Sequence, residues 1–588
     1  MADVSDQAEA SAPARPADLR PASPDGTAST LAQGVVMMLR ALGVKETFGV
    51  SGGGIVYMWD ALSASGVPTY HCRHETGALF AACEASIAAD RPVAVFVTTG
   101  PGLTNSLTGL MAARYEGAKV LLISGYTDPA YVGRFPIQET SPLSLPPQTL
   151  HTPNQTVQGV TILDSPQSLA GVWEACAAGF ARSTGYVHHL ALTVPAQRGH
   201  LPVPLSAPPR ATAADTPALD QALLSRLAAG RCALWVGWGA RRAAAAVAEL
   251  SERLDAPVMS TPRGKGIFPE AGPRYLGVTG LGGDPEVADA LRRHDPDFVI
   301  ALGSRLGDGA SCYDEAYLAR AQLIQVDLAP DDLPHVYPAD RLIRVEADVA
   351  AFAYALVEAA PAMCAPPTNT HHTGGPAPGH TPSAPPPRTE RLVHPRRLLH
   401  EIQSRFVDRG DLVMGDNGNA FAWGNRYLRF SRPGQWRVSN LYLGSMGHFA
   451  CGAVGAALAT GRRAVALVGD GAMLMQNEVS TAVQYNASVV WIVLNDASYG
   501  MCKQGTRALD LPYADSSLPM TDFAQYAEAL GARGIRVTAP EALHDALREA
   551  ATVQGPCVVD VLIDPEALAP TQRRFAGLKH VPSGGLRH

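Results

Sequence analysis

The sequence predicts an α/β protein made of three doubly wound domains, each a parallel sheet covered by helices on both faces. Short runs rich in β-branched residues alternate with amphipathic helical patterns along most of the chain, and this alternation is typical of parallel sheets. Stretches rich in proline, glycine and small polar residues divide the pattern into three blocks. The length of 588 residues is also too great for a single core.

The expected strands follow from the β-branched runs in each block. In the first block they lie at 45–50, 67–72, 92–99 and 118–125. In the second block they lie at 232–238, 298–303 and 322–328. In the third block they lie at 412–417, 463–470, 488–496 and 557–564. Doubly wound sheets bind ligands at the carboxyl ends of their strands, so candidate site residues are sought there.

The breaks between blocks set the expected domain boundaries. Residues 1–28 and 361–394 are rich in proline, alanine, serine and glycine, and they predict a disordered arm and a linker that cannot support a packed core. The expected layout is an arm at 1–28, a first domain at 29–200, a central domain at 215–360, a linker at 361–394, a third domain at 395–575 and a tail at 576–588.

Composition excludes several classes of protein. Hydrophobic residues make up 46% and charged residues 17%, with a net charge of -7, which suits a large globular protein. No basic patch of the kind that nucleic acid requires is evident. The nine cysteines form no CxxC pair, so a reducing cytoplasm is expected. The N-terminal residues have no apolar signal region, and no stretch is long and apolar enough for a membrane span.

The most specific signal is a Gly-Asp-Gly turn followed by Asn-Asp in the third block. Asp470 ends one expected strand, and Asn495 ends the next one 25 residues later. This is the length of one βαβ unit, so both ends should return to the same sheet edge. A Gly-Asp-Gly turn alone is more often an ordinary strand-to-helix turn, but the spaced Asn-Asp favours a binding site.

The residue types at this edge suit a diphosphate held through a hard cation. Backbone amides at a helix start, here those of Gly471 and Ala472, can bind phosphate oxygens. A hard divalent cation prefers carboxylate and carbonyl oxygens. Asp470, Asp496 and the Ser498 carbonyl are the expected ligands.

This motif resembles the signature of thiamine-diphosphate-dependent enzymes, in which Gly-Asp-Gly is followed after about 25 residues by Asn-Asn. The present chain has Asn-Asp, so the family position of the metal ligand holds Asp496. The change keeps an oxygen ligand and adds a negative charge, which favours a divalent cation such as Mg²⁺. The resemblance implies thiamine diphosphate as cofactor and makes the third domain the diphosphate-binding one.

The first block resembles the pyrimidine-binding domain of acetolactate-synthase-like members of that family. The matching segments are TFGVSGG at 47–53, RHETGA at 73–78 and TTGPGLTNSLTGL at 98–110. By family position, Glu75 protonates N1′ of the aminopyrimidine and so prepares N4′ to take the proton from thiazolium C2. Taken alone, Glu75 is more simply a first-turn helix residue favoured by the helix dipole.

Two further segments of the third block resemble elements that hold this cofactor. GSMG at 444–447 matches the element that folds the cofactor back on itself, with Met446 wedged between the rings and Gly444 accepting from N4′. GDNGNAF at 415–421 matches the first diphosphate loop, with Asn419 as the expected contact. Outside this context, Met446 could equally be core filler.

The reaction type is inferred from the loops near the expected substrate pocket. No His-His pair of the kind found in simple 2-oxo acid decarboxylases follows the GPG turn. Instead FPIQET at 135–140 resembles the synthase loop whose glutamine, here Gln138, faces the substrate, although Gln138 could also be a solvated loop residue. Carboligation of a decarboxylated 2-oxo acid with a carbonyl acceptor is therefore expected, with a lyase that releases aldehyde as the alternative.

The acceptor pocket departs from the synthase pattern. Synthases carry Gln-Trp after the metal motif, whereas this chain has Gln504 followed by Gly505. Loss of an indole should open volume, so an acceptor larger than pyruvate and an acyloin-type product of secondary metabolism are expected.

The resemblance carries three further expectations. The central block, with STPRGKGIFPE at 260–270 and GSRLGD at 303–308, resembles a domain that often holds FAD, but no GxGxxG follows a strand and FAD stays open. A homodimer or homotetramer with sites across the interface is implied. A non-catalytic relic that only binds nucleotide or assembles is the remaining alternative, and intact Glu75 and Asp470 argue against it.

Overall fold

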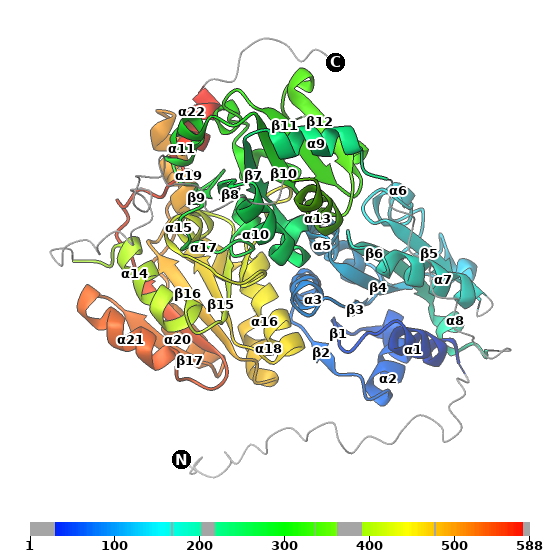
Figure 1. Cartoon of the computed structure of the whole chain (residues 1–588). Coiled ribbons are helices and arrows are strands. Elements are labelled where there is room, and N and C mark those ends of the chain that lie inside the picture. Colours follow the sequence, from blue (N-terminus) through cyan, green and yellow to red (C-terminus); the bar gives the residue numbers. More distant parts are fainter. Residues whose placement is uncertain are drawn as a thin grey trace. The chain divides into compact units, whose positions relative to one another are not determined.

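The computed structural model describes residues 30–165, 168–201, 218–333, 336–360, 391–475 and 478–579 (Figure 1). The expected arm at 1–28, most of the expected linker and the end of the expected tail lie outside these residues. Val393 is buried and forms a β-bridge with Ile563, and the ring of His394 accepts a hydrogen bond from the Arg396 amide. The last residues of the expected linker therefore take part in the third domain.

Three six-stranded sheets, each made of parallel strands, confirm the predicted fold class. The described residues before 83 and from 90 to 201 form one compact unit, which holds the first sheet. Those at 83–89 and from 218 onward form a second unit, which holds the other two. None of the described helices has both the length and the apolar character that crossing a membrane requires.

The first sheet has the strand order β2-β1-β3-β4-β6-β5. Its strands are β1 (Thr47–Gly49), β2 (Thr69–His71), β3 (Val93–Val97), β4 (Lys119–Tyr126), β5 (Gly159–Leu163) and β6 (Tyr186–Thr193). The helices of this part of the chain are α1 (Leu31–Ala41), α2 (Val56–Ala64), α3 (Glu75–Ala89), α4 (Pro101–Thr104), α5 (Leu107–Glu116), α6 (Pro147–Leu150), α7 (Leu169–Phe180) and α8 (Val194–Arg198).

The central sheet has the order β12-β11-β10-β7-β8-β9. Its strands are β7 (Cys232–Val236), β8 (Val258–Ser260), β9 (Tyr275–Val278), β10 (Phe298–Leu302), β11 (Gln322–Asp327) and β12 (Leu342–Glu346). Its helices are α9 (Gln221–Ala229), α10 (Ala244–Arg253), α11 (Val287–His294), α12 (Asp308–Ser311) and α13 (Val349–Ala359).

The third sheet has the order β14-β13-β15-β16-β18-β17, which repeats the arrangement of the first. Its strands are β13 (Leu412–Gly415), β14 (Trp436–Val438), β15 (Ala464–Gly469), β16 (Val489–Asn495), β17 (Arg533–Val537) and β18 (Cys557–Leu562). Its helices are α14 (Pro395–Ile402), α15 (Asn419–Tyr427), α16 (His448–Thr460), α17 (Asp470–Leu474), α18 (Glu478–Gln484), α19 (Gly500–Ala508), α20 (Phe523–Ala529), α21 (Leu543–Ala550) and α22 (Gln572–Lys579), and one π-helical turn spans Gln403–Val407.

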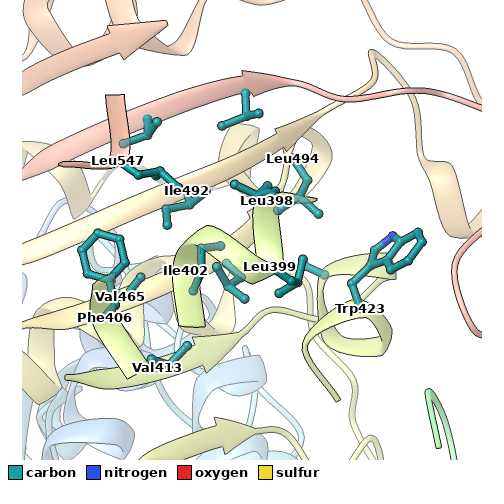
Figure 2. Packing of buried hydrophobic residues seen from close by; sticks show 14 of the residues in the cluster. Leu398, Leu399, Ile402, Phe406, Val413, Trp423, Val465, Ile492, Leu494 and Leu547 are labelled. Carbon is teal, nitrogen blue, oxygen red and sulfur yellow. The ribbon is translucent and has the colours of Figure 1, made fainter. Parts of the chain in front are cut away.

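Alternating side chains of the third sheet build two separate cores. Val413, Val465 and Ile492 face α14 and α21, whereas their chain neighbours face α16 and α18. The alternation is that of a strand, whose successive side chains point to opposite faces. Figure 2 shows the first core, with Leu398, Leu399, Ile402 and Phe406 lying beside Val413, Val465, Ile492 and Leu494. Burial on both faces explains why these strands are continuous apolar runs rather than alternating ones.

Candidate functional site

Asp470 lies where the Gly-Asp-Gly turn was predicted to form a site. It follows β15, whose last residue Gly469 is paired with Leu494 of the adjacent parallel strand β16. The carboxylate is buried and accepts hydrogen bonds from the Gly471 amide at 2.7 Å and the Ser498 amide at 3.0 Å. The 25-residue spacing therefore brings the Gly-Asp-Gly turn and the loop after Asn495 to one sheet edge.

The loop after β16 brings Asp496 beside Asn419. Asn495 has a structural role, because its side-chain amide donates to Asp560 at 2.8 Å and to the Thr521 carbonyl at 2.9 Å. A Cβ atom at Gly500 would lie 2.9 Å from Asn419 Nδ2 and 3.0 Å from Asp496 Oδ2. The ends of the two side chains therefore converge on Gly500, and a larger residue there would displace them.

The carboxyl groups of Asp470 and Asp496 lie close to each other. Burial first, and then the charge of Asp496, raise the pKa of Asp470 to about 6. Burial also raises the pKa of Asp496. The charge of Lys503 lowers the pKa of Asp496 in turn, although its ammonium group forms its ion pair with Glu566, at 3.4 Å. Such a pair is costly unless a positive charge joins it.

This donor set fits a hard divalent cation. The Ser498 carbonyl accepts one hydrogen bond, from the Gly500 amide at 2.8 Å, and a carbonyl oxygen has a second lone pair. Together with the Asp470 and Asp496 carboxylates it offers three oxygen ligands of the kind that Mg²⁺ prefers. The buried Asn419 Oδ1 has no hydrogen-bond partner in the described part of the chain, and it adds a fourth polar atom at this edge.

The two glycines of the Gly-Asp-Gly turn differ in what they do. A Cβ atom at Gly471 would lie 2.6 Å from the Tyr499 ring and 3.2 Å from Met446 Cε, so close packing requires glycine there. Gly469 has open space on its Cβ side and an ordinary backbone conformation. The Gly471 amide donates to Asp470, and its expected role toward phosphate, like that of the Ala472 amide, stays a prediction.

The segment around Met446 is held by the loop after β13. Buried Asp416 accepts from the amides of Gly447, Phe449 and Ala450 at 2.9, 2.8 and 3.1 Å, and so caps the start of α16. Asn417 Nδ2 donates to the Ser445 carbonyl at 2.5 Å. Neither role was predicted from the sequence, because the partners lie 28 to 34 residues further along the chain.

Met446 has one covered and one accessible side. It packs partly on the core beneath α16 and is half-buried, so it serves as core filler on that side. The neighbouring Gly444 and Gly447 have φ angles of 67° and 79°, a left-handed conformation that glycine adopts readily. The bends at these two glycines present Met446 beside the Gly-Asp-Gly turn, as its closeness to Gly471 indicates.

A buried ionic network supports α16 and was not predicted from the sequence. Glu84 accepts from the Arg437 guanidinium at 2.8 and 2.9 Å, and it contacts His448 Nε2 at 2.9 Å. Burial raises the pKa of Glu84, but the Arg437 and His448 interactions outweigh it and hold the pKa well below its usual range. Because a full charge pair already satisfies Glu84, its closeness to Cys83 and His448 reflects structure rather than a second metal site.

Glu75 lies in the first compact unit at the start of α3. It is buried, and its Oε2 accepts a hydrogen bond from Asn105 Nδ2 at 3.0 Å. A Cβ atom at Gly102 would lie 3.5 Å from Glu75 Oε1 and 2.8 Å from the Thr98 methyl group. The GPG turn therefore approaches the carboxyl group closely. Asn105 is a site residue that sequence analysis missed, although it stands within the matched 98–110 segment.

Gln138 lies directly over the GPG turn. Its Oε1 accepts from Thr99 Oγ1 at 3.2 Å, and a Cβ atom at Gly100 would lie 2.8 Å from Gln138 Cβ. The Gln138 backbone has a φ of 56°, which is uncommon for a non-glycine residue and often marks functional loops. The side chain is exposed but fixed in place, unlike a freely solvated loop residue.

Gln504 and Gly505 both lie next to the segment that contains α22. The Gln504 side chain binds the backbone of the segment before α22, with contacts of 3.1 Å to the Ala567 carbonyl and the Ala569 amide. A Cβ atom at Gly505 would lie 3.0 Å from the ring of Phe575, a buried residue of α22. The space expected from the missing indole is therefore filled by Phe575. A side chain 70 positions further along the chain gave no sequence signal for this.

The central sheet has the strand order of dinucleotide-binding folds when it is counted from β9. Trp238 lies in the segment after β7. The guanidinium carbons of Arg241, Arg263 and Arg437 lie 4.9, 5.2 and 4.8 Å from the centroid of its ring. Because Arg437 already pairs with Glu84, this cluster does not by itself indicate a ligand. FAD therefore stays an expectation, and no chemical step is assigned to it.

Comparison with protein families gives three matches in the order of the three sheets. Residues 29–145 match the thiamine pyrophosphate enzyme N-terminal TPP binding domain, residues 221–356 the central domain, and residues 416–561 the C-terminal TPP binding domain. These matches together cover about two thirds of the chain.

Curated relatives match along nearly their whole length. The acetolactate synthase large subunit of Haemophilus influenzae is 27% identical over 94% of this chain and 97% of its own. The acetolactate synthase isozyme 1 large subunit of Escherichia coli is 28% identical over 92% of this chain and 96% of its own. The acetolactate synthase large subunit of Parasynechococcus marenigrum is 28% identical over 89% and 86%.

Proposed function

The chain belongs to the thiamine pyrophosphate enzymes, and from that premise we propose that it is a carboligase that decarboxylates a pyruvate-like 2-oxo acid and joins the acyl unit to a second 2-oxo acid. The product would be an acetolactate-type 2-hydroxy-3-oxo acid with release of CO2. The observation that carries the proposal is the convergence of Asp470, Asp496 and Asn419 on one sheet edge beside Met446. Full-length similarity to acetolactate synthase large subunits supports the reaction type.

Residues of the third domain would hold the cofactor. We assign Asp470, Asp496 and the Ser498 carbonyl to Mg²⁺, and Asn419 with the Ala472 amide to the diphosphate. Met446 and Gly444 would support the folded-back cofactor. When bound, thiamine diphosphate supplies a nucleophilic carbon and an electron sink, which make loss of CO2 from a 2-oxo acid possible.

Residues of the first domain would handle the proton and the substrate. Glu75 would hold a proton toward N1′ of the aminopyrimidine, with its other oxygen fixed by Asn105. A carboxyl group positioned in this way acts as a general acid–base. Gln138, held by Thr99 over the GPG turn, would contact the substrate.

The acceptor assignment follows from the filled space at Gly505. The expectation of a larger acceptor depended on volume left by a missing indole, and Phe575 occupies that volume. A small acceptor of the pyruvate class therefore fits better than a bulky one. Magnesium, the acetolactate-type product and a homo-oligomer are parts of the proposal. The side chains of Phe135 and Ile137, 93% and 94% exposed next to Gln138, suit contact with a second copy.

The alternative is a lyase that releases an aldehyde. One experiment distinguishes the lyase reaction from the carboligase reaction by their products. Purified protein is incubated with thiamine diphosphate, Mg²⁺ and ¹³C-labelled pyruvate, and products are identified by mass spectrometry and NMR. The proposal predicts labelled acetolactate and CO2 in equal amounts. Free acetaldehyde as the main product would contradict it and favour the lyase.

The variant Glu75→Gln distinguishes an enzyme from a protein that only binds the cofactor. In Glu75→Gln, thiamine diphosphate should still bind within about threefold of the wild-type affinity, because the diphosphate contacts are intact. Turnover should fall by about a hundredfold or more, which is the usual contribution of a positioned acid–base group. Unchanged turnover would show that the carboxyl group of Glu75 takes no part.

A further inference from the structure

A basic pocket lies at the edge of the third sheet opposite to Asp470. Three loops that lead into the amino ends of the neighbouring strands β13, β14 and β15 form it. Its volume is about 530 Å³, within the range of small-ligand sites. Its charged and amide-bearing lining residues are Arg409, Asp411, Arg432, Gln435, Arg462 and Arg463.

Two of the arginines are fixed by backbone carbonyls. Arg462 donates to the Gly410 carbonyl at 2.6 Å, and Arg463 donates to the Ala551 and Val553 carbonyls at 2.6 and 3.2 Å. Gln435 is held in the same way by the Val407 carbonyl at 2.6 Å. Neutral acceptors leave the charge of a guanidinium group in place, and the one carboxylate that acts on these two arginines, Asp411, is shared with Arg409. This part of the pocket therefore keeps a net positive charge and is preorganised for an anion.

The side chains of the other two arginines, Arg409 and Arg432, are exposed and form no hydrogen bond with any residue that the structure describes. The charge of Arg409 acts on Asp411, whose pKa it lowers. Arg432 nevertheless reaches the pocket, since its Nη1 would lie 2.7 Å from a Cβ atom at Gly410. Each therefore has its full set of donors available for a ligand.

The charges in the pocket are unbalanced. Four guanidinium groups face a single carboxyl group, that of Asp411, whose buried Oδ2 has no hydrogen-bond partner among the described residues. The chain as a whole has a net charge of -7, so this local excess of positive charge runs against the overall composition. Four like charges in one pocket repel each other, and an anion would relieve that repulsion.

The lining also restricts the kind of anion. Apart from the residues named above, only a glycine and a proline line the pocket, so there is no aromatic ring on which a nucleobase could stack. Guanidinium groups bind phosphate in a two-pronged geometry, and four of them exceed the need of a single phosphate. We propose that this pocket binds a small molecule carrying two phosphate groups, at a site separate from the catalytic one.

The experiment uses the holoprotein with thiamine diphosphate saturating and free Mg²⁺ held constant, so that the catalytic site is filled. Fructose 1,6-bisphosphate serves as a two-phosphate probe, inorganic phosphate as a one-phosphate probe and citrate as a carboxylate probe. Calorimetric titration at low ionic strength should give one bisphosphate per chain, bound at least about tenfold more tightly than phosphate or citrate. The thermal midpoint of unfolding should rise with bisphosphate concentration.

A double variant and a matched control test the site. Arg409→Gln with Arg432→Gln should weaken bisphosphate binding by about tenfold or more. Arg293→Gln with Arg548→Gln removes the same charge elsewhere on the surface and should leave binding unchanged. Both pairs are exposed, and turnover should be the same in both variants, so loss of binding is not loss of fold or of the proposed activity.

Three results would overturn the proposal. The first is no saturable bisphosphate binding to the holoprotein. The second is binding that the Arg409 and Arg432 substitutions leave unchanged. The third is citrate binding more tightly than bisphosphate.

Discussion

At the residue scale, Asp470 and Asp496 place two partly buried carboxyl groups close together, an arrangement that a bound cation would make favourable. Asp470 is buried, and Asp496 beside it contributes to the rise in its pKa. The carboxylate of Asp470 is therefore expected to lower the stability of the fold, although cation binding requires it. Sequence analysis could locate this pair because both residues follow strands at a fixed spacing, which the parallel register of β15 and β16 turns into proximity.

Asp470→Asn should therefore stabilise the metal-free protein and impair cofactor binding. Removing one of two facing charges should raise the free energy of unfolding by about 1–3 kcal/mol near neutral pH. Affinity for thiamine diphosphate with Mg²⁺ should fall by about a hundredfold or more. Urea unfolding and calorimetric titration measure the two effects. Asp340→Asn, at an exposed carboxylate, is the control, and a destabilised metal-free Asp470→Asn protein would contradict the account.

Phe575 is the residue that sequence analysis had no means to predict. The match to the synthase motif ended at Gly505, and the motif carries no information on which distant ring packs there. The contact depends on where α22 lies after the chain has folded. Gln504, which binds the segment leading to α22, is part of the reason for that placement.

Phe575→Ala should widen the range of acceptors. Deleting the ring beside Gly505 leaves a cavity, at a cost of about 3 kcal/mol in stability if the site does not collapse. Pyruvate is given as donor and benzaldehyde as a bulky acceptor. The yield of the benzaldehyde-derived product relative to acetolactate should rise several-fold, as measured by chromatography. Leu568→Ala, in the same segment but 63% exposed, should leave the ratio unchanged. An unchanged ratio in Phe575→Ala would place the acceptor elsewhere.

At the element scale, the start of α16 connects the fold to the cofactor segment. Three features fix the start of this helix next to Met446. They are the bend at Gly447, the cap from Asp416 and the contact of His448 with Glu84. Sequence analysis identified the Met446 segment by resemblance. It could not identify the cap, because Asp416 lies 31 residues before Gly447 and the two meet only through the sheet.

Asp416→Ala should disturb the cofactor site through this helix start. Three buried amides would lose their acceptor, which should lower the free energy of unfolding by about 2 kcal/mol or more. Affinity for thiamine diphosphate should fall by about tenfold. Asp348→Ala is a matched control, because Asp348 caps α13 through the Ala350 and Ala351 amides at an exposed position. It should lose some stability and no cofactor affinity; equal losses of affinity in both variants would contradict the role of Asp416.

The first sheet contains a buried, neutral histidine in β6. His189 on β6 contacts Ser124 Oγ and the Leu150 carbonyl, each at 2.8 Å. Burial lowers its pKa to about 3. Because this folded-state pKa lies below that of an unfolded histidine, about 6.5, its contribution to stability is complete above pH 6.5 and is lost as the pH falls toward 3.

His189→Gln should make the protein more resistant to acid. Glutamine can offer a donor to Leu150 and an acceptor to Ser124 without gaining a proton. The pH midpoint of acid unfolding, followed by circular dichroism, should shift to a lower value. His400→Gln, at an exposed histidine, should leave the midpoint in place. An acid midpoint equal to that of the wild type in His189→Gln would show that another group controls acid unfolding.

The strands that sequence analysis found and missed differ in length and position. All eleven expected strands are present, and most are inner strands with apolar, β-branched runs buried on both faces. The exception is β2, a half-buried edge strand of three residues. Most of the missed strands lie at sheet edges, where short or polar runs suffice: β5, β9, β12, β14 and β17. Sequence analysis also missed two inner strands, β6 and β8. β6 contains His188 and His189, which weakened its apolar signal, and β8 has only three residues, Val258–Ser260.

At the scale of the whole molecule, the first and third sheets repeat one strand order. In both, the candidate site residues follow the carboxyl ends of strands near the point where the order reverses, which is where doubly wound folds bind ligands. The predicted fold class is confirmed by the three sheets and the three family matches. The assignment of Glu75 and Asp470 to a shared site across a dimer stays a prediction.

A crystal structure of the protein grown with thiamine diphosphate and Mg²⁺ tests the central claim most directly. The account predicts a metal ion bound by Asp470, Asp496 and the Ser498 carbonyl at about 2.1 Å, with the diphosphate on its other side. It also predicts the thiazolium and aminopyrimidine rings against Met446, and a Glu75 carboxyl group within hydrogen-bond distance of N1′. A metal ion bound without Asp470 and Asp496, or a cofactor whose pyrimidine meets no Glu75 carboxyl group in any copy, would contradict it.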